Sequence, residues 1–135
     1  MNEITVQASV ENIQKVTEWV DEQLELLNCS PKAQMQIDVA IDEVFGNIAH
    51  YAYPEGVGAA VIRFEPDPET GMVTLTFLDR GIPFNPLEKA DPDILAGPEE
   101  RAVGGLGIFL VKKTMDDVSY QSVDGQNILS LKKKI

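Results

Sequence analysis

Cysteine, long apolar runs and basic charge are all scarce in this sequence of 135 residues. The single cysteine, Cys29, excludes an internal disulfide and agrees with a reducing cytosol. No apolar run approaches the roughly 20 residues that a membrane-spanning helix needs. The first residues, Met1 to Thr5, contain neither the basic segment nor the apolar segment of a secretory signal. We therefore expect a cytoplasmic protein with no membrane partner.

Basic residues are outnumbered by acidic ones, since 11 Lys and Arg stand against 22 Asp and Glu, for a net charge of −11. A surface of this charge repels phosphate backbones and anionic lipids, so we expect no direct binding of nucleic acid. The acidity suits a basic protein partner, although it also serves solubility alone.

The chain is predicted to form one domain over residues 1–135, because it contains no repeat, low-complexity tract or linker. Apolar periodicity predicts the order β-α-α-β-β-lid-α-β-β. The expected strands are Ile4–Ala8, Ala59–Glu65, Met72–Leu78, Val118–Val123 and Ile128–Leu131, and the expected helices begin after Ser9, at Ser30-Pro31 (to about Tyr51) and at Leu106 (to Asp116). The proline-rich stretch of about residues 80–105 is expected to be a lid. The order predicts a two-layer α/β (α+β) sandwich, a mixed β-sheet covered on one face by three helices.

The second expected helix carries a polar stripe, Glu43, Asn47 and His50, beside its apolar face. Glu43 and Asn47 are neighbours on a helix surface at spacing i, i+4. One interpretation is a solvated flank of an amphipathic helix. The other is a hard-cation site, with the Asn47 side-chain oxygen on Mg²⁺ and Glu43 as a base, because Mg²⁺ needs few protein ligands when it also binds phosphates. For His50 we expect a position facing solvent or at the helix end.

Two further segments can bind a ligand. Asp79 and Gly81 follow an expected strand, where Asp79 is either a turn residue or an acceptor for the exocyclic amine of adenine, with Gly81 allowing close approach of the backbone. Gly104-Gly105-Leu106-Gly107 opens the third helix. It is either a flexible junction or a phosphate site formed by free N–H groups and the helix dipole. The segment matches neither the P-loop nor the dinucleotide-binding glycine pattern.

Taken together, these motifs resemble those of the GHKL ATPases, the relatives of gyrase and of sensor histidine kinases. Glu43-Val44-Phe45-Gly46-Asn47 is similar to the N box, Asp79-Arg80-Gly81-Ile82-Pro83-Phe84 to the G1 box, and Gly104-Gly105-Leu106-Gly107 to the G2 box. Within that group, the segment from Gly104 to Val118 resembles the anti-sigma-factor serine/threonine kinases.

The resemblance implies a Bergerat-type ATP-binding fold with ATP and Mg²⁺ as cofactors. It implies that Glu43 is the general base, that Asn47 holds Mg²⁺, that Asp79 reads adenine beside Gly81, and that Gly104, Gly105, Leu106 and Gly107 hold the phosphates. Members of this family phosphorylate a Ser or Thr of an anti-anti-sigma (STAS-domain) partner and sequester a sigma factor, usually as homodimers.

Two other functions are compatible with parts of this pattern. A binding module that uses ATP only to change its shape requires Asn47, Asp79 and the glycines but no base, so the presence of Glu43 favours the kinase. The ATPase part of a sensor histidine kinase is less favoured, because no phospho-accepting dimerisation helix is present in the sequence.

Overall fold

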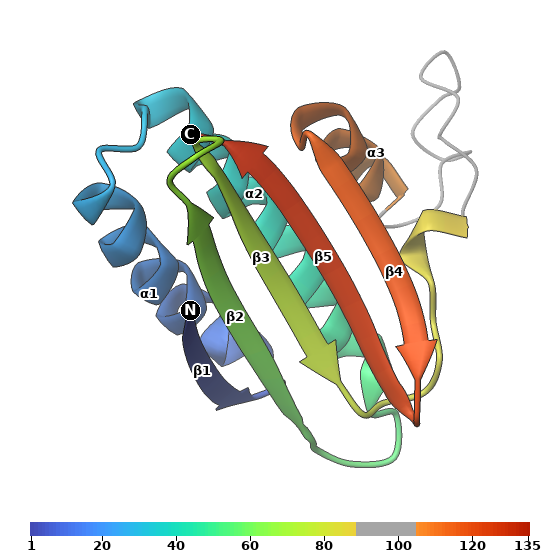
Figure 1. Cartoon of the computed structure of the whole chain (residues 1–135). Helices are drawn as coiled ribbons and strands as arrows, with labels where there is room; N and C mark the ends of the chain where they lie inside the picture. The colour runs from blue at the N-terminus through green and yellow to red at the C-terminus, as the bar shows by residue number, and fades with distance from the viewer. Residues whose placement is uncertain (89–104) are drawn as a thin grey trace.

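The computed structural model describes residues 1–88 and 105–135 and shows two layers, a five-stranded sheet and a layer of helices behind it (Figure 1). The strands are β1 (Asn2–Gln7), β2 (Ala59–Asp67), β3 (Met72–Asp79), β4 (Asp117–Val123) and β5 (Gln126–Lys134). The α-helices are α1 (Ile13–Leu26), α2 (Pro31–Asn47) and α3 (Gly105–Thr114). The predicted two-layer sandwich is therefore confirmed. No helix of the described ranges is long and apolar enough to cross a membrane.

The sheet has the order β1-β2-β3-β5-β4, and every neighbouring pair in it is antiparallel. The expected mixed sheet is wrong in this respect. Two helices connect β1 to β2 and bring the chain back to the end at which β1 finished, so β2 runs in the opposite direction. The single crossover through α3 makes β4 parallel to β3, but β5 inserts between these two strands and pairs with both. The parallel strands β3 and β4 are therefore not neighbours, and every pair in the sheet is antiparallel.

One face of the sheet and the inner faces of α1, α2 and α3 form the core. The alternate side chains of β2 and β3 that point to the helices are buried, as period-2 strands require. The helices bury side chains at spacings of three and four, as an amphipathic helix requires. The largest fully buried side chains are Phe45, Phe64, Phe77, Leu24, Ile41, Ile62, Leu131, Val16, Val20 and Val111.

Helix α2 begins as the sequence predicts and ends differently. The Ser30 hydroxyl accepts a hydrogen bond from the Ala33 N–H at 3.2 Å, and Pro31 occupies the first turn. After Asn47 the helix continues to Ala52 as one π-helical turn, Ile48–Ala52. The predicted cap at Ser9 is wrong. Its side chain makes no capping hydrogen bond, because the short 3-10 turn Val10–Asn12 separates it from α1.

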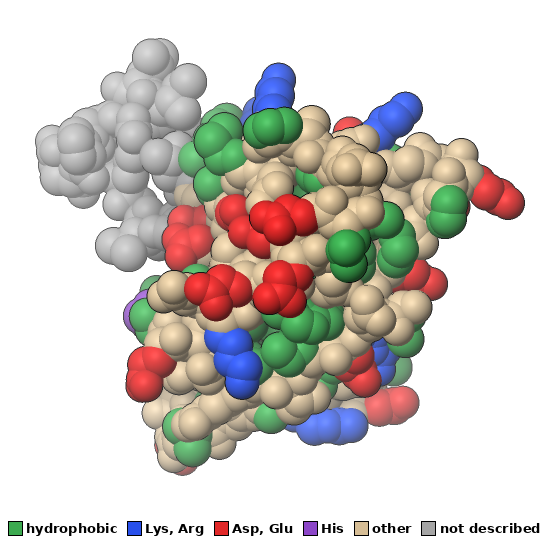
Figure 2. Space-filling model, turned by 90° about the vertical axis from the view of Figure 1, so that its left-hand side faces the viewer, with side chains coloured by type: hydrophobic (Ala, Val, Ile, Leu, Met, Phe, Trp, Pro, Cys, Tyr) green, Lys and Arg blue, Asp and Glu red, His purple; other side chains and the backbone are tan. Residues whose placement is uncertain are grey.

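Acidic side chains gather on the side of the molecule formed by α1 (Figure 2). The α1 sequence contains Glu18, Asp21, Glu22 and Glu25 but one basic residue, Lys15. Asp21 faces Asp38 of α2, and one oxygen of each carboxyl is buried without a hydrogen-bond partner among the described residues. Burial, followed by the hydrogen bond that forms with Asp21 when one of the two carboxyl groups is protonated and by the charge of Asp21, raises the pKa of Asp38 to about 7.

From the raised pKa of Asp38 we expect the free energy of unfolding to decrease as the pH rises. An unfolded aspartate has a pKa of about 3.9, so between about pH 4 and about pH 7 the folded chain binds more protons than the unfolded chain. The free energy of unfolding should therefore decrease over this range and level off above it. In Asp38→Asn this loss of unfolding free energy should be smaller by about 1 kcal/mol. The value is kept well below what the full pKa shift would give, because both side chains are partly exposed and solvent screens their interaction.

Urea unfolding at about pH 5 and about pH 8 measures this difference. Glu22→Gln, an exposed change on α1, is the control and should keep the wild-type dependence on pH. If Asp38→Asn and the wild type lose equal stability over the range, the pair does not share a proton.

Candidate functional site

Asp79 ends β3 and is buried, with 6% of its surface exposed. Its Oδ1 accepts hydrogen bonds from the Gly81 N–H at 2.9 Å and from the Asn127 side-chain amide at 2.9 Å. The first of these bonds closes a turn two residues ahead, as short acidic side chains commonly do at strand ends. The same carboxyl group also lines a cavity. The two interpretations of Asp79, turn residue and ligand group, are therefore compatible.

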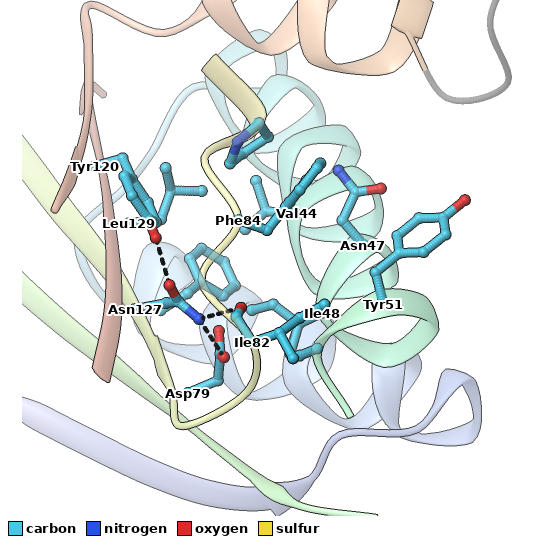
Figure 3. Close-up of a pocket in the computed structure, with 13 residues that line it drawn as sticks. Val44, Asn47, Ile48, Tyr51, Asp79, Ile82, Phe84, Tyr120, Asn127 and Leu129 are labelled. Carbon is cyan, nitrogen blue, oxygen red and sulfur yellow. Dashed lines mark hydrogen bonds between the residues drawn. The ribbon is translucent and has the colours of Figure 1, made fainter. Parts of the chain in front are cut away.

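The cavity lies between the C-terminal part of α2 and the adjoining ends of β3 and β5 (Figure 3). Its walls are mainly apolar and are formed by Val44, Asn47, Ile48, Tyr51, Ala52, Phe77, Asp79, Ile82, Phe84, Pro86, Tyr120, Asn127 and Leu129. The cavity volume is about 40 Å³. This is room for a few water molecules, whereas ligand pockets measure roughly 300–1,000 Å³. Tyr51 and Phe84 both line the cavity, and the centroids of their rings lie 6.4 Å apart. A ring-sized ligand needs more room than this volume, so the walls of the cavity must move apart for one to enter.

Glu43 lies one helical turn before Asn47 and is half-buried. Burial and, to a smaller extent, the charge of Asp42 raise the pKa of its carboxyl group. The carboxyl group lies directly against Gly107 in the first turn of α3, where a methyl group on residue 107 would overlap it. A glycine is therefore required at position 107 if Glu43 is to keep this place. The structure brings Glu43 to the start of α3 and Asn47 to the cavity wall beside Asp79.

Gly81 allows a close approach of two backbone segments. A side chain at this position would overlap the carbonyl oxygen of Ala52, which also accepts a hydrogen bond from the Ile82 N–H at 2.9 Å. The loop after β3 is thus fastened to the end of α2. Tyr53 supports this junction, because its hydroxyl donates to the Ala59 carbonyl at 2.7 Å and accepts from the Arg80 N–H at 2.8 Å. The close contact with Ala52 explains why a glycine stands at position 81. The predicted approach of the Gly81 backbone to a nucleotide base stays a prediction.

The remaining predicted residues lie at or beyond the edge of the described ranges. Gly105 and Leu106 begin α3, as the helix-start prediction requires. Gly104 and most of the predicted lid, residues 89–104, lie outside the described residues. The described part of the lid is a loop that ends in a short 3-10 turn, Pro86–Glu88. His50 is exposed on the π-helical turn, as expected.

Sequence reasoning missed Asn127 and Tyr120. Asn127 is buried on β5, with 7% of its surface exposed, and Tyr120 lies on β4. The Tyr120 hydroxyl donates a hydrogen bond to Asn127 Oδ1, and Asn127 in turn donates to Asp79 (Figure 3). The available signal was an amide at a position where the alternation of β5 calls for an apolar side chain. Such a residue requires buried hydrogen-bond partners.

A comparison with protein families matches residues 6–133 to the histidine kinase-like ATPase domain. The chain belongs to this family. The resemblance to GHKL ATPases seen in the sequence is thereby confirmed, and the family's use of a nucleotide applies to this ATPase domain.

Within the histidine kinase-like ATPase family, the chain is similar to protein kinases. It is 28% identical over 102 residues to the serine/threonine-protein kinase BtrW of Bordetella bronchiseptica, which covers 76% of this chain and 71% of BtrW. It is 32% identical over 98 residues to the serine-protein kinase RsbW of Bacillus thuringiensis. That match covers 70% of this chain and 60% of RsbW, so it spans less than two thirds of the length of that relative.

Two solved structures share the fold at low sequence identity. A chain in the SiaB–SiaC complex from Pseudomonas aeruginosa superposes with a TM-score of 0.61 at 19% identity, over 98% of this chain and 89% of that one. The catalytic domain of the histidine kinase ThkA superposes with a TM-score of 0.50 at 11% identity, over 99% of this chain and 97% of that one. These matches support the two-layer architecture described above.

Proposed function

We propose that residues 1–135 form one ATP-binding domain that acts as a protein serine/threonine kinase and anti-sigma factor. One observation carries the proposal: residues of all three motifs adjoin the C-terminal part of α2, where Glu43 lies against Gly107 and Asn47, one turn further along, shares the cavity wall with Asp79. The kinase names of the relatives support phosphate transfer over a module that only binds nucleotide.

Asp79 is the group that recognises the adenine base in this proposal. Its Oδ1 is engaged by Gly81 and Asn127, and its Oδ2 makes no hydrogen bond within the described residues. The free oxygen can accept a hydrogen bond from the 6-amino group of adenine. The apolar side chains that line the cavity would cover the faces of the adenine ring. A mainly apolar lining with few polar groups is usual for a small-molecule site. Because the cavity is small, adenine binding requires its walls to move apart.

Asn47 is the proposed protein ligand of Mg²⁺. The described residues contain no group of three His, Cys, Asp or Glu that would hold a metal ion by themselves. A single amide oxygen on the cavity wall fits a Mg²⁺ ion that takes its other ligands from phosphates and water. When bound, the ion neutralises charge on the transferred phosphoryl group.

Glu43 is the proposed base that takes the proton of the acceptor hydroxyl. It stands between Asn47, one turn ahead on α2, and the first turn of α3, the proposed phosphate site formed with Gly104, Gly105, Leu106 and Gly107. Burial raises the pKa of Glu43 and makes it a stronger base than an exposed carboxylate. Phosphoryl transfer needs mainly such positioning and charge neutralisation.

The proposed partners are a STAS-domain anti-anti-sigma factor, which would receive the phosphate on a Ser or Thr, and a sigma factor, which would be sequestered by a homodimer. The net charge of −11 and the acidic side in Figure 2 suit a basic protein surface and disfavour direct contact with nucleic acid. We place the protein in the cytoplasm for this function.

Incubation with Mg-ATP and the STAS proteins encoded near its gene tests the proposal. The expected result is a single added phosphate on one of these proteins by mass measurement, together with a heat of binding for Mg-ATP by calorimetry. Binding without transfer to any STAS protein would instead favour the nucleotide-dependent binding module. The absence of any heat at saturating Mg-ATP would reject both.

A further inference from the structure

The side-chain amide of Asn127 connects parts of the candidate site that are distant in the sequence. Asn127 stands opposite Asp79 in the antiparallel register of β5 and β3. Its Nδ2 donates to Asp79 Oδ1 at 2.9 Å and to the Ile82 carbonyl at 3.0 Å, with the Gly81 carbonyl at 3.4 Å. Its Oδ1 accepts from the Tyr120 hydroxyl (Figure 3). The amide thus holds both the carboxyl group that ends β3 and the first turn of the loop over the cavity.

The surroundings of Asn127 allow only one orientation of the amide. On one side lie a carboxylate and two carbonyl groups, which are acceptors, and on the other lies a hydroxyl, which can donate. A flipped amide would place its oxygen against Asp79 and the carbonyl of Ile82 and would lose the bonds to both, keeping only a contact with the Tyr120 hydroxyl. The acceptors on Asp79 and Ile82 therefore fix the direction in which Asn127 donates, and the Tyr120 hydroxyl holds the amide from the other side.

The bonds that Asn127 and Gly81 donate determine which oxygen of Asp79 is left for a base. With Oδ1 held by Asn127 and Gly81, the carboxylate has one oxygen left, Oδ2, and that oxygen can only accept a hydrogen bond. Adenine presents a 6-amino donor at its Watson–Crick edge, whereas guanine presents a 6-oxo acceptor. Two acceptors face each other if guanine binds, and a buried unpaired polar group is costly.

We infer that Asn127, held in place by Tyr120, is a positioning residue that makes the cavity select adenine over guanine nucleotides. The inference rests on the proposed function, because it assumes that Asp79 reads the base. Leucine at position 127 has a similar shape but no donor, and would release both the Asp79 carboxylate and the start of the loop. Threonine would offer one donor for the several acceptors that the amide now serves.

Calorimetric titration of the whole chain with Mg-ATP and with Mg-GTP tests this role. Asn127→Leu should lower the preference for ATP over GTP by about tenfold or more, the size expected for a lost hydrogen bond to a charged group. Tyr120→Phe, which removes only the hydroxyl, should lower the same preference by about threefold, the size of a neutral hydrogen bond. In the Asn127→Leu background, Tyr120→Phe should have no further effect, because Tyr120 acts through Asn127.

The matched control is Ser130→Ala. Ser130 pairs with Thr76 at 3.3 Å between the same strands, β5 and β3, but on the face away from the helices. This variant should keep the wild-type preference, so that a general loosening of the strand pair is distinguished from a change at the cavity. Thermal unfolding shows whether each variant is folded, and if Asn127→Leu is not, the result for Tyr120→Phe decides.

The outcomes separate this inference from the proposed function. A wild-type protein that binds neither nucleotide would reject the proposed function and the inference with it. A wild-type protein that prefers ATP, together with folded Asn127 and Tyr120 variants that keep this preference, would reject the inference alone. Equal loss of preference in Ser130→Ala would also reject it, since the effect would then belong to the strand pair.

Discussion

Replacement of Glu43 with glutamine is expected to lower phosphate transfer to a STAS partner by at least about 100-fold, the usual contribution of a general base. Glutamine keeps the shape of the side chain that lies against Gly107 but cannot accept the proton of the acceptor hydroxyl. Mg-ATP affinity should remain within about threefold, less than the loss of one charged hydrogen bond. Transfer is measured with labelled ATP and affinity by calorimetry.

The control for this prediction is Glu25→Gln, the same chemical change at an exposed position of α1. It should leave both transfer and affinity at the wild-type values. Gly107→Ala tests the same contact from α3, because the added methyl group displaces the Glu43 carboxyl group, and transfer should again fall more than affinity. Undiminished transfer by Glu43→Gln would remove Glu43 from the role of base.

The dependence of transfer on pH gives a second test of Glu43. The charge of Asp42 contributes to the raised pKa of Glu43. In Asp42→Asn this repulsion is absent, so the Glu43 pKa falls and the rising limb of the rate should move to lower pH. A purely structural role for Glu43 predicts no such movement.

Replacement of Asp79 with asparagine is expected to weaken Mg-ATP binding by about 100-fold, within the range for loss of a charged hydrogen bond in a buried site. The amide oxygen can still accept from Gly81 and Asn127, so its NH₂ group takes the place of Oδ2. Two donors then face each other when adenine binds. Binding of Mg-GTP should decrease less, because the same NH₂ group can donate to the guanine oxygen.

Asp67→Asn is a closely matched control for Asp79→Asn. Asp67 ends β2, and its Oδ1 accepts from the N–H two residues ahead, on Glu69, at 3.0 Å. Asp79 makes the same type of bond at the end of β3, but Asp67 is not part of the cavity wall. The control should therefore keep full affinity. If Asp79→Asn is folded and binds Mg-ATP as tightly as the wild type, another group reads the base.

Much of the architecture could be predicted because it follows from local patterns. The apolar period of two over β2 and β3, and of three to four over α1 and α2, reports which side chains are buried. Ser30-Pro31 signals the start of α2 in the same local way. Periodicity could not predict the π-helical turn after Asn47. That turn is fastened by tertiary contacts, the packing of Gly81 on Ala52 and the hydrogen bond from Ile82.

By itself, the sequence determined the helices and strands, the acidic charge and the three ordered motifs that indicate the histidine kinase-like ATPase family. Only the tertiary structure decided that β5 lies between β3 and β4, which places Asn127 opposite Asp79 and within reach of Tyr120. It also decided that the Glu43 carboxyl group lies on Gly107. The physical reason is that local periodicity reports which face of an element is buried, whereas strand order and register depend on packing summed over the whole sheet.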